Sequence, residues 1–143
     1  MIIIDTNIIS EMMKPTVAHQ VLTWLNQQDN TQLFVTSITI AEICYGLNVL
    51  PKGNRRNLLE SAFHKAIMES FQYRILFFDD SAAFLYGKIM GQRKQLGRPL
   101  SIADGQIAAI ASVHGFSLAT RNIKDFNDCN IELIDPFERI TIA

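Results

Sequence analysis

The chain has 143 residues, of which 48% are hydrophobic and 19% are charged, and its formal net charge is −1. This length suits one compact domain, and the apolar content excludes an intrinsically disordered chain. The near-zero charge excludes a protein that attracts nucleic acid as a whole, so a polyanion must be held by local patches or through a metal ion.

Neither cysteine usage nor the first residues indicate export. Cys44 and Cys129 are too few for a disulfide framework and lack metal-ligand spacing, so we expect both to be reduced packing residues. The apolar run 1–4 leads directly into an acid, without the basic start and longer apolar stretch of a signal peptide. Apolar runs stay far below the ~18 residues of a membrane span. We therefore expect a cytoplasmic protein that binds no membrane.

Short apolar runs alternate with amphipathic segments in the first half of the chain. Continuous apolar runs indicate buried strands, and apolar residues at helical spacing indicate helices. We expect strands over residues 1–4 and 33–36, a short helix ending near 14–15, and a second helix over 17–25. A further helix begins at Ser37 and carries four apolar residues on one side: Ile40, Ile43, Cys44 and Leu47.

The second half continues this alternation after a breaker at 51–54. We expect helices over 55–71, from Asp79 or Asp80 to Leu96 with Gly97 as the stop, and over 102–114 before Gly115. Strands are expected over 74–78, 117–120 and 132–134. The alternation predicts one α/β domain over residues 1–143, with a central parallel sheet of four to five strands flanked by helices.

Acidic and amide residues recur near the ends of these strands. Asp5 closes the first strand, and Glu42 lies on the helix after the second. Asp104 lies early in its helix, Asn122 follows the fourth strand, and Asp125 comes three residues later. In open α/β sheets, ligands bind at the carboxyl ends of the strands, so we expect these side chains to share one site.

Each of these residues also has a purely structural interpretation. Asp5 and Asp125 could only cap helices, and Asn122 could only hold a turn. Asp104 in a first helical turn is favoured by the helix dipole. Glu42 is flanked by isoleucines, and an apolar setting is costly for a carboxylate without a partner or metal. The joint placement, rather than any single residue, favours a site.

Clustered carboxylates suit phosphodiester hydrolysis. They can hold Mg²⁺ or Mn²⁺, which lowers the pKa of a bound water and polarises the phosphate. The sequence has no glycine-rich phosphate loop, no His/Cys metal set and no nucleophile elbow. His19, His64 and His114 are isolated, and helix-surface positions explain them better than catalysis.

Four segments resemble the motifs of PIN domains, in order and spacing: IIIDTNIISE, TSITIAEICYGL, SIADGQIAAIA and LATRNIKDF. More narrowly, the chain resembles VapC-type toxins of bacterial toxin–antitoxin pairs, in their FitB-like branch, over nearly its whole length. The resemblance implies a three-layer PIN-like fold and a metal-dependent endoribonuclease that hydrolyses RNA. It also implies a homodimer, inhibited by a small DNA-binding antitoxin whose complex represses its own operon.

The resemblance also implies roles for individual residues. Asp5, Glu42 and Asp104 match three of the family's four acidic positions, which bind Mg²⁺ or Mn²⁺ and activate water. The fourth position matches Asn122, whose amide contributes no charge and cannot act as a base. Either Asp125 replaces the missing acid, or the site works with three acids.

Neighbouring residues complete the expected site. The resemblance implies that Thr6 and Asn7 assist by hydrogen bonding, and Thr120 is a similar candidate. Three basic clusters could guide a phosphate backbone, although a solvated helix surface explains the first two equally well. They are Lys52 with Arg55 and Arg56, Arg93 and Lys94 with Arg98, and Arg121 with Lys124. Arg121 borders the expected site.

The expected helix 55–71 has more apolar face than a surface helix needs, so we expect this helix or residues 47–50 to contact an antitoxin or a second copy. Two other functions remain open. A phosphatase could use Asp5 as its nucleophile, but Asn7 stands where many such enzymes have a second Asp. A catalytically weak or inactive PIN-like subunit of a DNA-binding repressor complex would agree with Asn122.

Overall fold

The computed structural model describes residues 1–138 and 140–142, with the side chains described for 1–138. One sheet has the strand order β3-β2-β1-β4-β5-β6, in which β6 alone is antiparallel to its neighbour. The strands are β1 (Ile2–Ile4), β2 (Leu33–Thr36), β3 (Ile75–Leu76), β4 (Ser117–Ala119), β5 (Leu133–Asp135) and β6 (Ile140–Ile142). The predicted parallel sheet is confirmed, and the antiparallel edge strand β6 was not predicted.

The helices also follow the predicted order. They are α1 (Thr6–Met12), α2 (His19–Asn26), α3 (Ser37–Val49), α4 (Asn54–Lys65), α5 (Asp80–Gln95), α6 (Ile102–His114) and α7 (Ile123–Phe126). Asp79 caps α5 by accepting a hydrogen bond from Ala82 N at 2.9 Å, and Gly115 ends α6 at a φ of 65°. The expected helix 55–71 consists of α4 and a π-helical turn, η2 (Ala66–Ser70).

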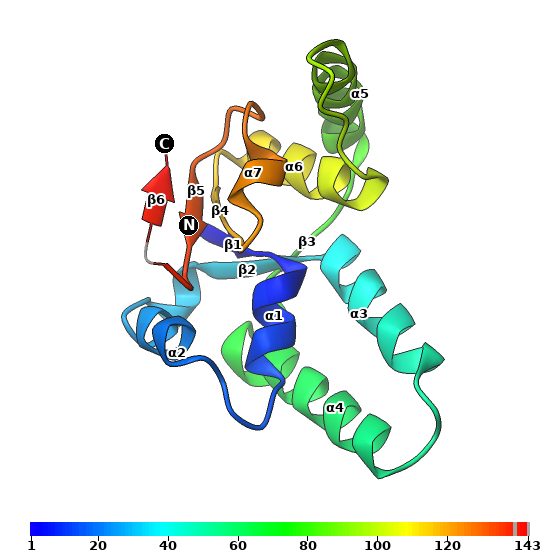
Figure 1. The fold of residues 1–143 in the computed structure, drawn as a ribbon, viewed down its shortest axis with the longest axis vertical. Helices are drawn as coiled ribbons and strands as arrows, with labels where there is room; N and C mark the ends of the chain where they lie inside the picture. The colour runs from blue at the N-terminus through cyan, green and yellow to red at the C-terminus, as the bar shows by residue number, and fades with distance from the viewer. Residues whose placement is uncertain (139, 143) are drawn as a thin grey trace.

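The sheet separates two apolar cores, because side chains alternate across each strand. On β1, Ile4 packs into the core beneath α1, α2, α3 and α4, whereas Ile3 packs into the core beneath α5, α6 and α7. Figure 1 shows α1, α2 and α4 on one side of the sheet and α6 and α7 on the other. This arrangement confirms the three-layer α/β fold.

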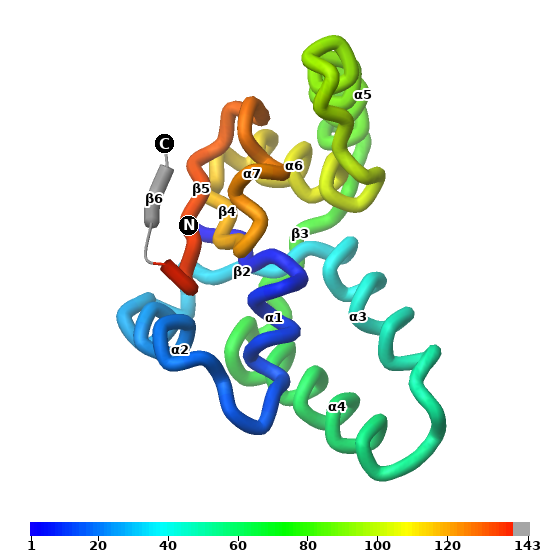
Figure 2. The backbone as a smooth tube through the Cα atoms, viewed as in Figure 1, coloured from blue at the N-terminus to red at the C-terminus, as the bar shows by residue number. Residues whose placement is uncertain are grey.

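The connections between strands determine where a site can form. From β1 the chain first builds β2 and β3 on one side, and it then passes through α5 and α6 to β4 on the other side of β1 (Figure 2). Connections that diverge in this way open a crevice at the carboxyl ends of the strands. Asp5 stands at this point, and its main-chain N–H donates to Ala119 O at 2.9 Å.

Three predictions about burial are wrong. Cys44 and Glu42 are exposed, because α3 turns Ile43 and Leu47 toward the core and leaves residues 42 and 44 outside that face. Arg93, expected on a basic surface, is 3% exposed because its guanidinium reaches inward to main-chain carbonyls. Cys129 is buried as predicted.

The apolar face of α4 and η2 is largely used within the molecule. Phe63, Ile67 and Phe71 belong to the core beneath α1 and α2, which leaves Leu58 as a large exposed side chain at 63% exposure. The segment formed by α4 and η2 therefore exposes less apolar surface than the sequence predicted. In the residues that the structure describes, no helix combines the length and apolar character needed to cross a membrane.

Candidate active site

A cavity of about 420 Å³ opens where β1 and β4 end. The structure brings together most of the predicted site, since seven of its residues line the cavity: Asp5, Thr6, Asn7, Glu42, Asp104, Arg121 and Asn122. Thr120 lies directly behind Asp5 and is fully buried. Asp125 lines a neighbouring hollow that also borders Arg121 and Asn122.

Asp5 combines a structural role with a position in the cavity. It follows the buried strand β1 and caps α1, and its Oδ1 accepts the main-chain N–H of Thr6 at 2.8 Å. Its Oδ2 accepts the hydroxyl of Thr120 at 2.8 Å and the amide of Asn7 at 3.4 Å. Asp5 therefore both caps α1 and lines the cavity, so the structural and the functional interpretations are compatible.

The pKa of Asp5 is raised to about 6, and burial of the side chain is the largest cause. The hydrogen bonds from Thr120 and Thr6 lower it in part, and the negative charges of Asp104 and Glu42 raise it further. A buried carboxylate near two others is a costly arrangement unless a positive charge joins it. The electrostatics of the site thus favour a bound cation.

Glu42 reaches the cavity from α3 and is held by a residue of α1. The hydroxyl of Thr6 donates to Glu42 Oε1 at 2.7 Å, and Thr6 Oγ1 lies 3.0 Å from Thr39 Oγ1. Because Thr6 directly follows Asp5, one dipeptide fixes one carboxylate and orients a second. Glu42 is exposed to solvent on α3 and is not enclosed by its apolar sequence neighbours.

Asp104 enters the cavity from the first turn of α6, where Ser101 Oγ caps the helix by accepting the Asp104 N–H at 3.2 Å. The side chain is partly buried, and burial is the main reason that its pKa is raised. Ser101 lowers this pKa in part, and the charges of Glu42 and Asp125 raise it further. Asp125 thus affects the site electrostatically from outside the cavity lining.

Asn122, the residue that the resemblance assigns to the fourth acidic position, lies at the turn between β4 and α7. Asn122 donates its main-chain N–H to Thr120 Oγ1 at 3.0 Å and lines the cavity. Asn7 joins the same network, since its amide lies 3.4 Å from Thr120 Oγ1 and its Oδ1 accepts the Arg121 N–H at 3.2 Å. Thr120 therefore connects Asp5, Asn7 and Asn122.

Four further residues line the cavity that sequence reasoning missed: Ser10, Glu11, Lys14 and Phe137. Glu11 is 6% exposed and pairs with the exposed ammonium of Lys14 at 3.1 Å. Positions 7, 11 and 14 recur every three or four residues on α1 and its end, and this spacing could have revealed the polar face. The guanidinium of Arg121 stacks 4.2 Å above the ring of Phe137.

The predicted basic clusters separate in space. Lys14 and Arg121 border the cavity, whereas Arg56 pairs with Glu60 at 2.8 Å and Arg98 pairs with Asp128 at 2.7 Å. Of the three clusters, only the one containing Arg121 reaches the candidate site.

The oxygen donors fit a hard divalent cation. Carboxylates and an amide carbonyl are the ligands that Mg²⁺ and Mn²⁺ prefer. In the part of the chain that the structure describes, no three acidic, histidine or cysteine side chains converge tightly enough to form a finished metal cluster. Asp5, Glu42 and Asp104 instead line one shared cavity.

Comparisons with known proteins agree with this geometry. The sequence model of the family described as PIN domain matches residues 2–130. The VapC ribonuclease Y4jK of Sinorhizobium fredii is 37% identical, over 96% of this chain and 99% of that protein. The toxin FitB of Neisseria gonorrhoeae is 34% identical over the same shares. A chain of FitAB bound to an IR36 DNA fragment aligns with a TM-score of 0.88 at 34% identity, over 96% of both chains.

Proposed function

This chain belongs to the PIN-domain family, and we propose that it cleaves RNA with the help of a divalent cation. It is a ribonuclease toxin of a toxin–antitoxin module, in agreement with the VapC and FitB relatives that match it over nearly their whole length. We propose that it acts in the cytoplasm, because its proposed RNA substrate and the operator DNA of the proposed antitoxin complex are found there.

One observation carries the proposal. Asp5, Glu42 and Asp104 come from three distant parts of the sequence and line one cavity at the divergence of the strand connections. These three carboxylates would hold Mg²⁺ or Mn²⁺, with the Asn122 carbonyl as a neutral fourth oxygen. When bound, the cation lowers the pKa of a water and neutralises charge on the phosphoryl oxygens.

The protein's own groups keep the acids in position. Thr6 and Thr120 hold the two oxygens of Asp5, so the carboxylate cannot rotate away from the cavity. The Thr6 hydroxyl fixes Glu42 in the same way. With a pKa of about 6, Asp5 is mainly ionised at neutral pH and is available as a ligand.

The rim of the cavity supports a polyanionic substrate. Lys14 is 60% exposed beside the nearly buried Glu11, and Arg121 is held over Phe137. Two cations thus flank an acidic centre, where they can bind phosphates that neighbour the reacting one. The net charge of the chain is −1, so this local positive charge would have to attract the RNA.

We further propose two assemblies. FitAB is a complex bound to DNA, and by analogy the chain binds a small DNA-binding antitoxin. We propose that the antitoxin contacts the hollow between α3 and α4, which is lined by Leu47, Phe63 and Ile67 among others. A homodimer would cover Phe84, which is 83% exposed on α5. Co-purification with the product of a neighbouring gene, and sedimentation of the purified chain, test the two assemblies.

A second candidate function is a catalytically weak subunit of a DNA-binding repressor complex. Asn122 favours it, because an amide at the fourth position brings less charge to a cation than an acid would. The cleavage experiment below separates the two functions.

The test uses the purified, antitoxin-free chain, a labelled RNA pool and a Mg²⁺ titration. The parent should cleave RNA, EDTA should abolish cleavage, and excess Mg²⁺ should restore it. Asp5→Asn should be inactive, whereas Asp80→Asn, which changes an exposed aspartate of α5, should retain activity. Cleavage that resists EDTA would refute the metal, and a folded but inactive parent that still binds DNA with its partner would favour the repressor subunit.

A further inference from the structure

Arg93 has an unusual environment for an arginine. It lies in the last turn of α5 and is 3% exposed. Within residues 1–138, no carboxylate lies at ion-pair distance from its guanidinium. Its charge is instead surrounded by main-chain oxygens, which requires a specific arrangement of those oxygens because burying an unpaired charge is costly.

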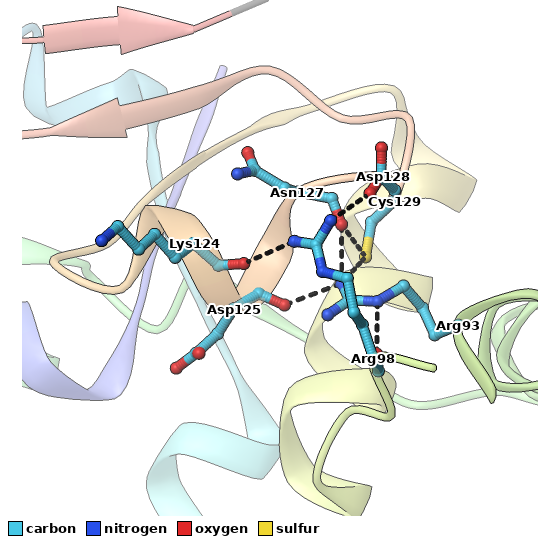
Figure 3. Close-up of polar contacts among 7 residues, drawn as sticks. All are labelled: Arg93, Arg98, Lys124, Asp125, Asn127, Asp128 and Cys129. Atoms are coloured by element: carbon cyan, nitrogen blue, oxygen red, sulfur yellow. Dashed lines mark hydrogen bonds and ion pairs between the residues drawn. The ribbon is translucent and has the colours of Figure 1, made fainter. Parts of the chain in front are cut away.

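Figure 3 shows the contacts that hold this guanidinium. Nε donates to Arg98 O at 2.7 Å, and Nη1 donates to Asp125 O at 2.8 Å and to Asn127 O at 2.6 Å. Nη1 also lies 3.4 Å from Cys129 Sγ. A single side chain of α5 therefore binds the main chain on both sides of the end of α7.

Two of the carbonyls that Arg93 binds, those of Asp125 and Asn127, lie at the C-terminal end of α7. A helix leaves its last four carbonyls without intrahelical hydrogen bonds, and α7 has only four residues. A cation at a helix C-terminus also interacts favourably with the helix dipole. Arg93 thus caps α7 from a different element, and a helix this short depends on tertiary contacts for its stability.

The segment held by Arg93 carries two residues that bear on the candidate site. Asn122, the residue before α7, lines the cavity, and the charge of Asp125 acts on Asp104. Asp104 lies on α6, which packs along α5. Arg93 is therefore a buried link between the helix pair that carries Asp104 and the segment that carries Asn122 and Asp125.

We propose that Arg93 is a positioning residue of the active site, which holds residues 122–127 at the correct distance from Asp104. The proposal rests on the proposed function, since it assigns a role in cation binding and RNA cleavage at that same site. It differs from a purely structural role in one respect. Loss of Arg93 must change the cation dependence of the reaction in addition to the stability of the fold.

The test compares Arg93→Lys and Arg93→Met with the parent in the full chain. Lysine keeps the charge but offers a single ammonium, which cannot reproduce the fork that binds several carbonyls. Loss of such a supporting contact should raise the half-saturating Mg²⁺ concentration by about tenfold or more and lower kcat, with little change in KM for RNA. Hydrogen exchange of residues 122–130 should accelerate in both variants.

Two controls separate positioning from stability. Arg98→Met removes the exposed ion pair to Asp128 and the hydrogen bond to Lys124 O, which contact the same segment from the surface, and should leave Mg²⁺ dependence near the parental value. The Arg93→Lys effect on Mg²⁺ should also shrink in a variant that carries both Asn122→Ala and Asp125→Asn, because the groups being positioned are then gone. If Arg93→Met fails to fold, Arg93→Lys carries the test.

Parental kcat and Mg²⁺ dependence in Arg93→Lys, with only a lower Tm, would overturn the proposal. An RNA-inactive parent would instead refute the proposed function. In that case the Mg²⁺-induced shift in Tm and the hydrogen exchange of residues 122–130 still decide the role of Arg93. Equal values in parent and Arg93→Lys would reject it, and a reduced shift with faster exchange would support it.

Discussion

The hydroxyl of Thr120 donates to Asp5 Oδ2 at 2.8 Å, and this contact joins the ends of two neighbouring parallel strands. It is one of the two hydrogen bonds that oppose the effect of burial on the pKa of Asp5. The ability of Asp5 to ionise therefore depends on a residue that lies far away in the sequence.

We predict that Thr120→Val, which keeps the shape but removes the donor, raises the pKa of Asp5 above about 6. Because binding a cation requires the ionised carboxylate, the acidic limb of the rate profile for RNA cleavage should move to higher pH. At alkaline pH, where Asp5 is ionised in both proteins, the variant should approach the parental rate. A uniform loss of rate at every pH would show that the change damages packing instead.

The metal-free protein should become more stable as the pH falls from about 6 to about 4. The pKa of Asp5 rises from 3.8 when unfolded to about 6 when folded, so the folded state binds its proton more tightly. The resulting penalty develops as pH rises from 3.8 to 6 and is complete above that, at about 3 kcal/mol. Melting in EDTA should show this slope in the parent and a weaker slope in Asp5→Asn. Equal slopes would contradict the shifted pKa.

Asp104→Asn should melt at a higher temperature than the parent in EDTA at neutral pH. The substitution removes a partly buried charge that faces Glu42 and Asp125. Added Mg²⁺ should stabilise the parent but hardly the variant, as thermal melts with and without Mg²⁺ would show. Asp80→Asn serves as the control, with a parental response to Mg²⁺. Equal metal-induced shifts in all three proteins would remove Asp104 from the proposed ligands.

Asn122→Asp should lower the Mg²⁺ concentration needed for half-maximal cleavage, because it adds a charged oxygen within the cavity lining. Asp125→Asn should matter less, since Asp125 lies outside that lining and acts through its charge. Mg²⁺ titrations of the cleavage rate measure both effects. An unchanged titration in Asn122→Asp together with a collapsed rate in Asp125→Asn would make Asp125 the fourth ligand.

Lys14→Gln should raise KM for RNA several-fold and leave kcat close to the parental value, since the side chain lies at the rim and pairs with Glu11 rather than with Asp5, Glu42 or Asp104. The dependence of binding on salt should weaken by about one unit of slope, as expected for one lost phosphate contact. Lys52→Gln, which changes an exposed lysine of the α3–α4 turn, is the matched control. An identical effect of both substitutions would argue for general charge rather than a defined phosphate site.

Features with a strong local signal could be predicted from the sequence. The apolar run before Asp5 predicted β1, and α6 extends over residues 102–114 and ends at Gly115 as expected. The placement of Asp5, Glu42 and Asp104 on one cavity followed from the general rule for parallel sheets together with the family resemblance.

Features that depend on distant partners could not be predicted. The position of Arg93 suggested a surface helix, since two of its three carbonyl partners, those of Asp125 and Asn127, lie more than 30 residues later in the chain. Helix α7 has four residues, too few to show a periodic pattern. Glu42 looked buried because its neighbours are apolar, but the rotation of α3 about its axis is set by the packing of Ile43 and Leu47.

The central position of β1 in the sheet determines when the site can form during synthesis. On the ribosome, Asp5 is among the first residues to emerge, but its partner strand β4 follows more than 110 residues later. A nascent chain cut short before β4 has the first acid and lacks both the strand that supports it and the turn that carries Asn122. Incomplete translation products should therefore be harmless to the cell, and toxicity should begin only after residues 117–119 have joined the sheet and the turn with Asn122 has formed.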